Sequence, residues 1–516
     1  MDLHFDFAAI HLTDELAYKW TVTDTVCVRG YAFVDDVLLQ AESLASYFTE
    51  VDSAEDAIHR VARLSGIYNV IITLQDGIFA CVDQTRSMPL FYRKQGALLE
   101  LYDSLDDSAI QNLSIDEDML RVYKCGLNTL GDKTVFQAVY QIQARHCLIA
   151  NEDSVLQKEY LSFSYPEKQI QDVDVAAEAT HQFFLTTFRR LIRVLNGRTA
   201  VIPLSGGHDS RLIAFYLKHL GYSNIVAYTY GIPNNPEVLC SKQVAKALDI
   251  PWHFVPHKPA AMRRFFRAEY EKFAVMAGNG VSVPCLQEWY AVYRLKQQGI
   301  ITEDSVIVPG YGAIHCLAKN NKSEVTYADL VKNILTEHFE SIEIQTPEQK
   351  EFLISCIEKE LSNYCSQAQT YTDTQAQQIM ECFNRNTRQS LFICNAVRVY
   401  DYFSCQWAIP FFEWENFCHW SQIDNELRRG KKALNAMQET VFPAALNAVP
   451  FAPSIARSRF MKYLNILRFG TQAFHFMYGY YRLGFRFFCD MIKRQRRSVN
   501  AYARDAYIAL VTKLSR

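Results

Sequence analysis

The chain contains 516 residues, of which 49% are hydrophobic, and its 53 basic and 56 acidic residues give a formal net charge of −3. This composition is typical of a folded protein of about two to four domains, and the balanced charge excludes a general attraction to nucleic acid. The sequence has no run of about 18 uncharged apolar residues, so it does not predict a membrane-spanning helix.

We expect the protein to reside in the cytoplasm. Its start, from Met1 to Asp6, does not show the basic region and apolar stretch of a secretory signal. The 14 cysteines are scattered and none forms a Cys-x-x-Cys pair. They therefore predict thiols in a reducing compartment and no disulfide framework or zinc site.

Short strand-like runs dominate residues 1–165. They lie at residues 25–30, 68–74, 77–83 and 147–150, separated by Gly, Asp and Asn. Runs of this length between turn residues predict an N-terminal α+β domain.

Residues 166–450 are predicted to form an α/β domain. A long amphipathic helix would carry Phe184, Phe188, Leu191 and Leu195 on one face. Strands and helices then alternate, which predicts a doubly wound parallel sheet, and residues 323–403 predict a helical C-terminal part. The strands are expected at 199–204, 225–230 and 305–309, and the helices at 212–220 and 238–248.

A glycine-rich motif follows the first strand of this domain, directly after Leu204. It runs Ser205-Gly206-Gly207-His208-Asp209-Ser210 and begins a helix, so backbone N–H groups and a helix N-terminus converge on one point. The glycines would let a phosphate approach, the serine hydroxyls could donate to its oxygens, and Asp209 could hold Mg²⁺. The motif has no Gly-Lys-Ser/Thr ending, which disfavours γ-phosphoryl transfer. The alternative is a Ser/Gly turn that caps a helix.

This motif resembles the pyrophosphate loop of the N-type ATP pyrophosphatases, and its surroundings resemble the asparagine synthetase and β-lactam synthetase superfamily. The resemblance implies ATP and Mg²⁺ as cofactors, transfer of AMP to a carboxylate, and attack of an amine on the acyl-adenylate. Residues 228–231 are similar to the family's second strand, whose end holds the adenine. The implied nucleotide-binding residues are Leu204, Ser205, Gly206, Gly207, Asp209, Ser210, Tyr230, Gly231 and Gly310, with Asp209 also the metal ligand.

The N-terminal domain resembles the family's glutaminase-like (Ntn-hydrolase-type) domain, most clearly at residues 83–92. In that family the nucleophile is a cysteine exposed as the mature N-terminus. Here position 2 is Asp2, and the nearest cysteine, Cys27, lies in a predicted strand where we expect it to be buried. We therefore predict a scaffold without glutaminase activity, so that nitrogen arrives as free ammonia or as an amine of the acceptor.

The second phosphate-side motif departs from the family. Asparagine synthetases have Gly-x-Gly-x-Asp-Glu, whereas this chain continues from Gly310 and Tyr311 to Ile314 and His315. Asp209 is then the only matched carboxylate, and Glu237 or Glu288 would have to compensate for the missing ones. By similarity to β-lactam synthetases, Tyr311 is either part of a base for the attacking amine or a wall of the pocket.

Two further segments complete the resemblance. Lys431 and Lys432 fall where the family keeps a lysine that stabilises the pentavalent phosphorus, and either one could serve. Residues 388–400 and 407–413 are similar to asparagine synthase-related proteins of surface-polysaccharide biosynthesis.

Residues 451–516 are predicted to form a basic, aromatic, helical extension. Residues 457–497 contain ten Lys or Arg, one acid and eleven Phe or Tyr. This composition favours either peripheral contact with the inner face of the membrane or a helix that covers the α/β domain.

The hypothesis from the sequence is therefore an ATP-dependent, AMP-forming amide ligase that acts on a small-molecule or glycan-linked carboxylate with ammonia or an amine. A lactam- or peptide-cyclising synthetase and a non-catalytic nucleotide-binding protein are the alternatives. Assembly as a homodimer stays open.

Overall fold

The computed structural model describes residues 2–5, 7–13, 16–167, 169–312, 324–339, 346–452 and 499–515. Ile314, His315 and the basic aromatic residues 457–497 lie outside these ranges. The predictions made for them therefore stay predictions.

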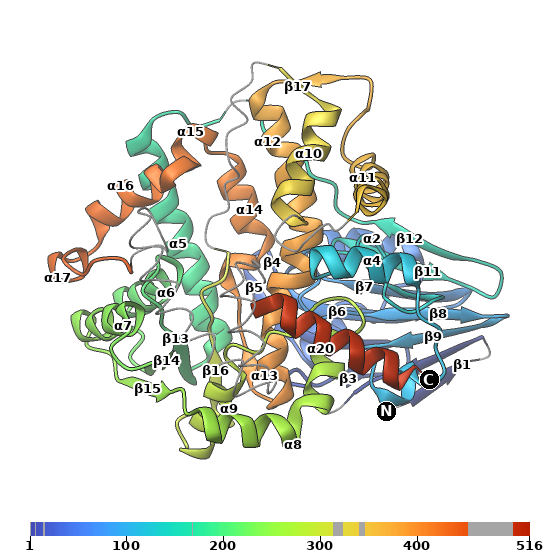
Figure 1. Ribbon diagram of the computed structural model, residues 1–516, viewed down its shortest axis with the longest axis horizontal. Coiled ribbons are helices and arrows are strands. Elements are labelled where there is room, and N and C mark those ends of the chain that lie inside the picture. The colour runs from blue at the N-terminus through green and yellow to red at the C-terminus, as the bar shows by residue number, and fades with distance from the viewer. Residues whose placement is uncertain are drawn as a thin grey trace.

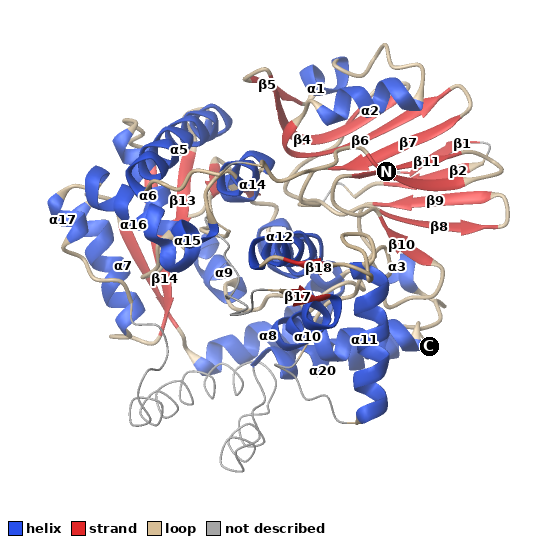
Figure 2. Ribbon diagram, turned by 90° about the horizontal axis from the view of Figure 1, so that it is seen from above, coloured by secondary structure: helices blue, strands red, loops and turns tan. Residues whose placement is uncertain are grey.

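The N-terminal part contains two stacked, largely antiparallel sheets (Figure 2). In the smaller sheet the pairing of its second and third strands is parallel. This sheet has the order β1 (Asp2–Phe5), β2 (Ala8–His11), β9 (Leu98–Tyr102), β8 (Phe91–Gln95), β10 (Val139–Gln141). The larger has the order β12 (Val155–Glu159), β11 (His146–Ala150), β7 (Gly77–Val82), β6 (Ser65–Leu74), β4 (Val26–Val34), β3 (Thr21–Val22), with β5 (Val37–Gln40) paired to β4.

The central strand β6 is buried on both faces. Tyr68 and Val70 belong to a core shared with the helices α1 (Glu42–Ser46) and α2 (Ala54–Ala62), whereas Ile71 packs toward the smaller sheet. Successive side chains of a strand point to opposite faces, so one strand can serve both apolar layers. Two short helices, α3 (Asp107–Ile110) and α4 (Glu117–Gly126), complete this part.

The second part is built on a five-stranded, entirely parallel sheet, as the alternating pattern predicts. Its chain order reverses between β13 and β16, which is the position where open α/β sheets bind ligands. The order is β15 (Trp252–Pro256), β14 (Ile225–Gly231), β13 (Thr199–Pro203), β16 (Ser305–Ile307), β19 (Gln406–Trp407).

Helices cover both faces of this sheet, so that its strands are buried on both sides. One face packs against α5 (Val173–Leu195), α6 (Asp209–His219), α7 (Pro236–Ala247) and α16 (Lys432–Val441). The other packs against α8 (Pro259–Gly278), α9 (Trp289–Gln297) and α13 (Arg398–Tyr402).

The predicted helical part packs around its own apolar core, which α4 of the N-terminal part also joins. Beside this core a long helix changes its winding to a π-helix, here called η1 (Arg385–Ile393), before it reaches α13. The elements are β17 (Val325–Thr326), α10 (Tyr327–His338), α11 (Pro347–Leu361), β18 (Thr370–Tyr371), α12 (Asp373–Asn384), α14 (Trp414–Ser421), α15 (Asn425–Arg428) and α17 (Ala444–Asn447).

The described end of the predicted extension is α20 (Val499–Leu514), which packs on the body of the protein near α8 and α4 (Figure 1). The backbone N–H of Gly280 donates to the hydroxyl of the buried Tyr507 at 2.8 Å. A helix docked in this way is part of the fold. None of the helices in the described ranges is both long and apolar enough to cross a bilayer.

Buried polar contacts join the N-terminal part to the α/β part. Arg398 pairs with Asp401 at 2.7 Å and also donates to the carbonyl of Ser87. Tyr31 donates to Glu413 at 3.3 Å. Because these groups are shielded from water, removing one of them would leave its partner without a hydrogen bond.

Asp103→Ala tests the buried ion pair of the N-terminal sheets. Asp103 accepts from Arg29 at 3.0 Å, and both residues are 2% exposed. The substitution leaves a buried guanidinium without its carboxylate, so we expect the free energy of unfolding to fall by about 3–5 kcal/mol in urea denaturation. The control is Asp35→Ala, which breaks the exposed pair with Arg63 and should cost less than about 1 kcal/mol. Equal losses in the two variants would contradict this interpretation.

Glu413→Gln tests the contact between the N-terminal part and the α/β part through the pH dependence of the free energy of unfolding. Burial, and after it the charge of Glu415, raises the pKa of Glu413 to about 8 from its ordinary value of 4.5. Between these values the folded protein binds the proton more tightly than the unfolded chain, so rising pH lowers the free energy of unfolding. One such group contributes about 1.4 kcal/mol per pH unit.

We therefore expect Glu413→Gln to gain stability relative to the wild type as pH rises from about 5 to about 8, measured by urea denaturation at each pH. The exposed Glu117→Gln is the control and should follow the wild type. A stability difference for Glu413→Gln that stays constant across this window would refute the assignment.

Candidate functional site

A cavity of about 490 Å³ lies at the carboxyl ends of β13 and β14, next to the segment that follows β16. This is the point where the strand order reverses. The sequence predicts a ligand site here, and six predicted residues line the cavity: Leu204, Ser205, Ser210, Tyr230, Gly310 and Tyr311.

Residues 205–210, here called the serine loop, lead into α6 and are held in place by hydrogen bonds to their own serine hydroxyl groups. The backbone N–H of Ser205 donates to Ser210 Oγ at 2.9 Å, the two serine hydroxyls are 2.9 Å apart, and Gly207 N–H donates to Ser205 Oγ at 3.2 Å. In the described structure, the N-cap residue His208 makes no side-chain cap to the first turn of α6. The side chain of His208 therefore does not cap the positive end of the helix dipole, while Asp209 places an acid in the first turn.

Two glycines are required here by packing. A Cβ on Gly310 would lie 2.4 Å from the backbone nitrogen of Ser210, and a Cβ on Gly206 would lie 2.5 Å from Cβ of Ala452. Gly207 has more room, since its nearest contact would be Ser205 Oγ at 3.3 Å. Gly206 is therefore required by the approach of Ala452, and its contact with a phosphate stays a prediction.

Residues 449–452 cover one side of the loop. The N–H of Ala452 donates to the carbonyl of Gly206 at 3.0 Å. Arg211 donates to the carbonyls of Val449 and Pro450 at 2.9 and 3.0 Å, and the ring of Phe451 stacks on His208 at 3.8 Å. A ligand can therefore approach the loop from the cavity that Ser205 and Ser210 line, and not across Gly206.

A buried carboxylate lines the same cavity. Glu288, which is 4% exposed, accepts from Tyr228 at 2.9 Å, from Tyr311 at 3.4 Å and from Tyr400. Burial raises the pKa of Glu288 above its ordinary value, and the three phenol hydrogen bonds oppose that shift. Burial, and then the charge of Glu288, raises the pKa of Tyr311. The sequence named Glu288 only as a substitute acid, because no spacing rule brings it to three tyrosines from distant segments.

The remaining predicted residues lie around the loop without lining the cavity. Asp209 is the first residue of α6, and Gly231 ends β14. The half-buried Lys431 lies close enough to His208 that its charge, after burial, lowers the pKa of His208 to about 4. Lys432 is exposed.

The acids of this region are dispersed. Glu237, in the first turn of α7, lines the cavity, and burial raises its pKa. Over the ranges that the structure describes, no cluster of three or more His, Cys, Asp or Glu side chains is arranged to hold a metal ion. Any divalent cation would therefore need ligands from a nucleotide as well as from Asp209.

The N-terminal part contains no nucleophile at the position of the described Asp2, which lies in β1. Cys27 lies in β4 and is 6% exposed, and burial raises the pKa of its thiol to about 11. A protonated, buried thiol is a poor nucleophile. The expected burial of Cys27 is thus confirmed.

Comparisons with known proteins add a distant likeness. Neither a scan against protein-family models nor a search of curated proteins finds a match. Among solved structures, the chain is similar to an allosteric regulatory enzyme of purine biosynthesis, with 9% identity and a TM-score of 0.19 over 47% of this chain. The aligned region covers 62% of that structure, which is less than two thirds of its length.

Gly310→Ala tests the close approach of the β16 segment to α6. The added Cβ meets backbone atoms that cannot rotate away, so we expect a loss of about 1–3 kcal/mol in the free energy of unfolding. Gly207→Ala, in the serine loop that Gly310 approaches, is the control and should cost less than about 1 kcal/mol. Urea denaturation measures both, and a neutral Gly310→Ala would show that the approach is looser than described.

Proposed function

We propose that the protein is an ATP-dependent, AMP-forming amide ligase that activates a carboxylate as its adenylate and couples it to an amine. One observation carries this proposal: a single cavity contains a serine loop at a helix N-terminus and, with it, a buried acid that accepts a hydrogen bond from a tyrosine. The first arrangement suits phosphate, and the second suits removal of a proton from a nucleophile.

The triphosphate would bind from the cavity side of the loop. Ser205 and Ser210 would then exchange their mutual hydrogen bond for phosphate oxygens. In the activation step a carboxylate oxygen of the substrate bonds to the α-phosphorus and the bond to the leaving pyrophosphate breaks. Lys431, beside His208, is the better placed of the two lysines to offset the charge of the leaving group, because Lys432 is exposed.

Asp209 is the proposed protein ligand for Mg²⁺, with Glu237 as a second acid that lines the cavity. The cation would neutralise phosphate charge and so favour departure of pyrophosphate. The dispersed acids agree with a metal that arrives bound to the nucleotide.

Tyr311 and Glu288 are the proposed proton acceptors for the amine. Because the pKa of Tyr311 is raised, a standing phenolate is unfavourable. The tyrosine would instead pass its proton to Glu288 while it takes one from the amine nitrogen. The nitrogen bonds to the acyl carbon, the bond from that carbon to the phosphate oxygen breaks, and AMP leaves.

The nitrogen donor is proposed to be free ammonia or an amine of the acceptor, since Cys27 of the N-terminal part is buried and its thiol pKa is raised. An intramolecular, lactam- or peptide-forming reaction is the second candidate, favoured by the Tyr311 to Glu288 hydrogen bond. A glycan-linked carboxylate is the proposed substrate class of the first.

Pyrophosphate–ATP exchange by the purified chain tests the activation step. With carboxylates such as aspartate and glucuronate, we expect exchange in the wild type and its loss in Asp209→Ala. Asp174→Ala, in the first turn of α5, removes an equivalent acid elsewhere and should retain exchange. Full exchange in Asp209→Ala would reject the metal role, and the absence of exchange with every carboxylate would favour a nucleotide-binding protein without catalysis.

Tyr311→Phe separates the two chemical steps. It keeps the ring but removes the proton relay, so amide formation should fall by about 10²–10⁴-fold while exchange persists. Tyr140→Phe, on β10 of the N-terminal sheet, is the control. Ammonium should support amide formation, whereas glutamine should not. Glutamine-dependent turnover by the chain alone would refute the prediction that the N-terminal part has no glutaminase activity.

A further inference from the structure

A second large cavity, of about 680 Å³, forms a groove between the N-terminal part and the helical part. Its walls come from the turn before β11, residues 162–165, the C-terminal end of α11, the length of α12 from Gln375 to Cys382, the start of η1, and α14. Figure 2 shows α12 and α14 between the N-terminal sheets and the parallel sheet. The groove shares no lining residue with the cavity at the serine loop.

Arg385, the first residue of η1, lines this groove, and two of its guanidinium nitrogens have no hydrogen-bond partner among the residues that the structure describes. Its Cζ lies 4.5 Å from the ring centre of Phe417 and 5.1 Å from that of Trp414. Nε and Nη2 are shielded from solvent and form no hydrogen bond within the described structure. These two nitrogens form the edge of a guanidinium that binds a carboxylate or phosphate in bidentate fashion.

The acids that line the groove or lie beside Arg385 are engaged by other groups. Glu360, which lines the groove, accepts from the hydroxyl of Tyr364 at 3.3 Å. Glu159 accepts from Arg145 at 3.1 Å. Glu381 pairs with Arg428 at 2.9 Å and accepts from Tyr165, also at 2.9 Å. The positive charge of Arg385 therefore has no compensating carboxylate among them.

A second guanidinium adds to this charge. Cζ of Arg145 lies 5.1 Å from the same Trp414 ring, on which Arg385 also stacks. Burial, and then the charge of Arg145, lowers the pKa of Arg385 to about 10, which leaves it protonated at neutral pH. A mostly buried cation without a counterion is costly, and an anionic ligand would offset that cost.

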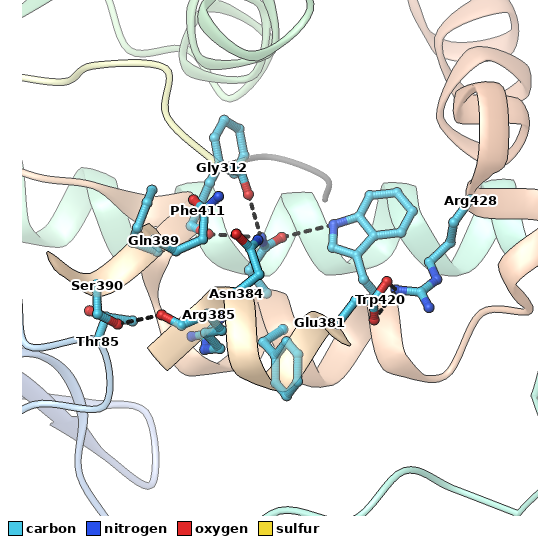
Figure 3. A pocket seen from close by; sticks show the side chains of 13 residues that line it. Thr85, Gly312, Glu381, Asn384, Arg385, Gln389, Ser390, Phe411, Trp420 and Arg428 are labelled. Carbon is cyan, nitrogen blue, oxygen red and sulfur yellow. Dashed lines mark hydrogen bonds and ion pairs between the residues drawn. The ribbon is translucent and has the colours of Figure 1, made fainter. Parts of the chain in front are cut away.

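The position of Arg385 is fixed by its backbone. Ser390 Oγ donates to the carbonyl of Arg385 at 2.7 Å, and the two residues also line a small cavity of about 50 Å³ (Figure 3). Stacking on two rings fixes the guanidinium as well. An anion site with a fixed donor loses little conformational entropy on binding.

The rest of the groove can hold the hydroxyl-bearing portion of a ligand, such as a sugar ring. Its rim carries the exposed side chains of Ser162, Ser164, Asn363 and Gln375. Their hydroxyls and amides both donate and accept, as sugar hydroxyls require. The rings of Phe163 and Trp414, 5.4 Å apart, offer apolar surface for the C–H face of such a body.

We propose that this groove binds a small molecule that carries an oxyanion on a hydroxylated body, of the class of a carboxylated or phosphorylated sugar, with Arg385 as the anion contact. The site lies apart from the proposed ligase cavity. Its occupancy can be measured without ATP and regardless of whether the ligase proposal holds.

Isothermal titration calorimetry of the full chain tests the proposal with four probes: glucuronate, glucose 6-phosphate, inorganic phosphate and glucose. We expect both sugar anions to bind and glucose to bind at least about 10-fold more weakly. In Arg385→Met the affinity for the sugar anions should fall by about 10- to 100-fold, the usual effect of losing hydrogen bonds to a charged group. Arg388→Met is the matched control, because Arg388 lies on the same helix and stacks on Phe392 outside the groove.

Thermal unfolding of Arg385→Met distinguishes a loss of ligand binding from a defect in folding. Methionine retains much of the apolar stem and removes an unpaired buried charge, so Arg385→Met should melt no lower than the wild type while losing the upward shift that glucuronate gives. Sugar anions that bind Arg385→Met as tightly as the wild type would overturn the proposal, as would the absence of binding for every probe. Inorganic phosphate binding as tightly as glucose 6-phosphate would overturn the part that assigns a sugar.

Discussion

The approach of Gly310 to the first turn of α6 is the contact on which the arrangement of the cavity depends. With Ser210 N only 2.4 Å from where a Cβ would be, any other residue would separate the segment after β16 from the serine loop. This contact places Tyr311 in the cavity that Ser205 and Ser210 line, and the parallel sheet holds both segments at its carboxyl edge. The serine loop and the hydrogen-bonded pair of Tyr311 and Glu288 are thus brought together by one close packing of backbones.

The cavity at the serine loop and the groove lined by Arg385 differ in their electrostatics. The cavity at the loop combines a helix N-terminus with the buried acid Glu288, so it can serve both an anion and a nitrogen that must lose a proton. In the groove between the N-terminal part and the helical part, by contrast, a positive charge lacks a partner. Within the described residues, Nε and Nη2 of Arg385 form no hydrogen bond, whereas Glu159 and Glu381 pair with other arginines. The helix from α12 through η1 joins them, since Arg385 lines the groove and Phe392 lines the loop cavity.

Local patterns in the sequence predicted the features that depend on neighbouring residues. The alternation after residue 199 predicted β13, α6, β14, α7 and β16, and Cys27 was expected inside a strand. The edge strands β15 and β19 were missed, because β15 interrupts its apolar run with His253 and β19 has only two residues. Contacts between distant segments were beyond prediction, namely residues 449–452 on the serine loop and Glu288 among its tyrosines. For residues 451–516 the sequence offered a helix that covers the α/β domain as one of two alternatives, and α20 is such a docked helix.

The central claim is that the serine loop accepts the triphosphate of a nucleotide from the cavity side. A crystal structure of the full chain with Mg²⁺ and a non-hydrolysable α,β-methylene analogue of ATP tests it most directly. The claim predicts phosphate density against Ser205 and Ser210, adenine toward Tyr230, and residues 449–452 still in contact with Gly206. An analogue bound elsewhere, or a cavity that stays empty at millimolar ligand, would contradict the claim and leave an α/β fold with a sealed loop.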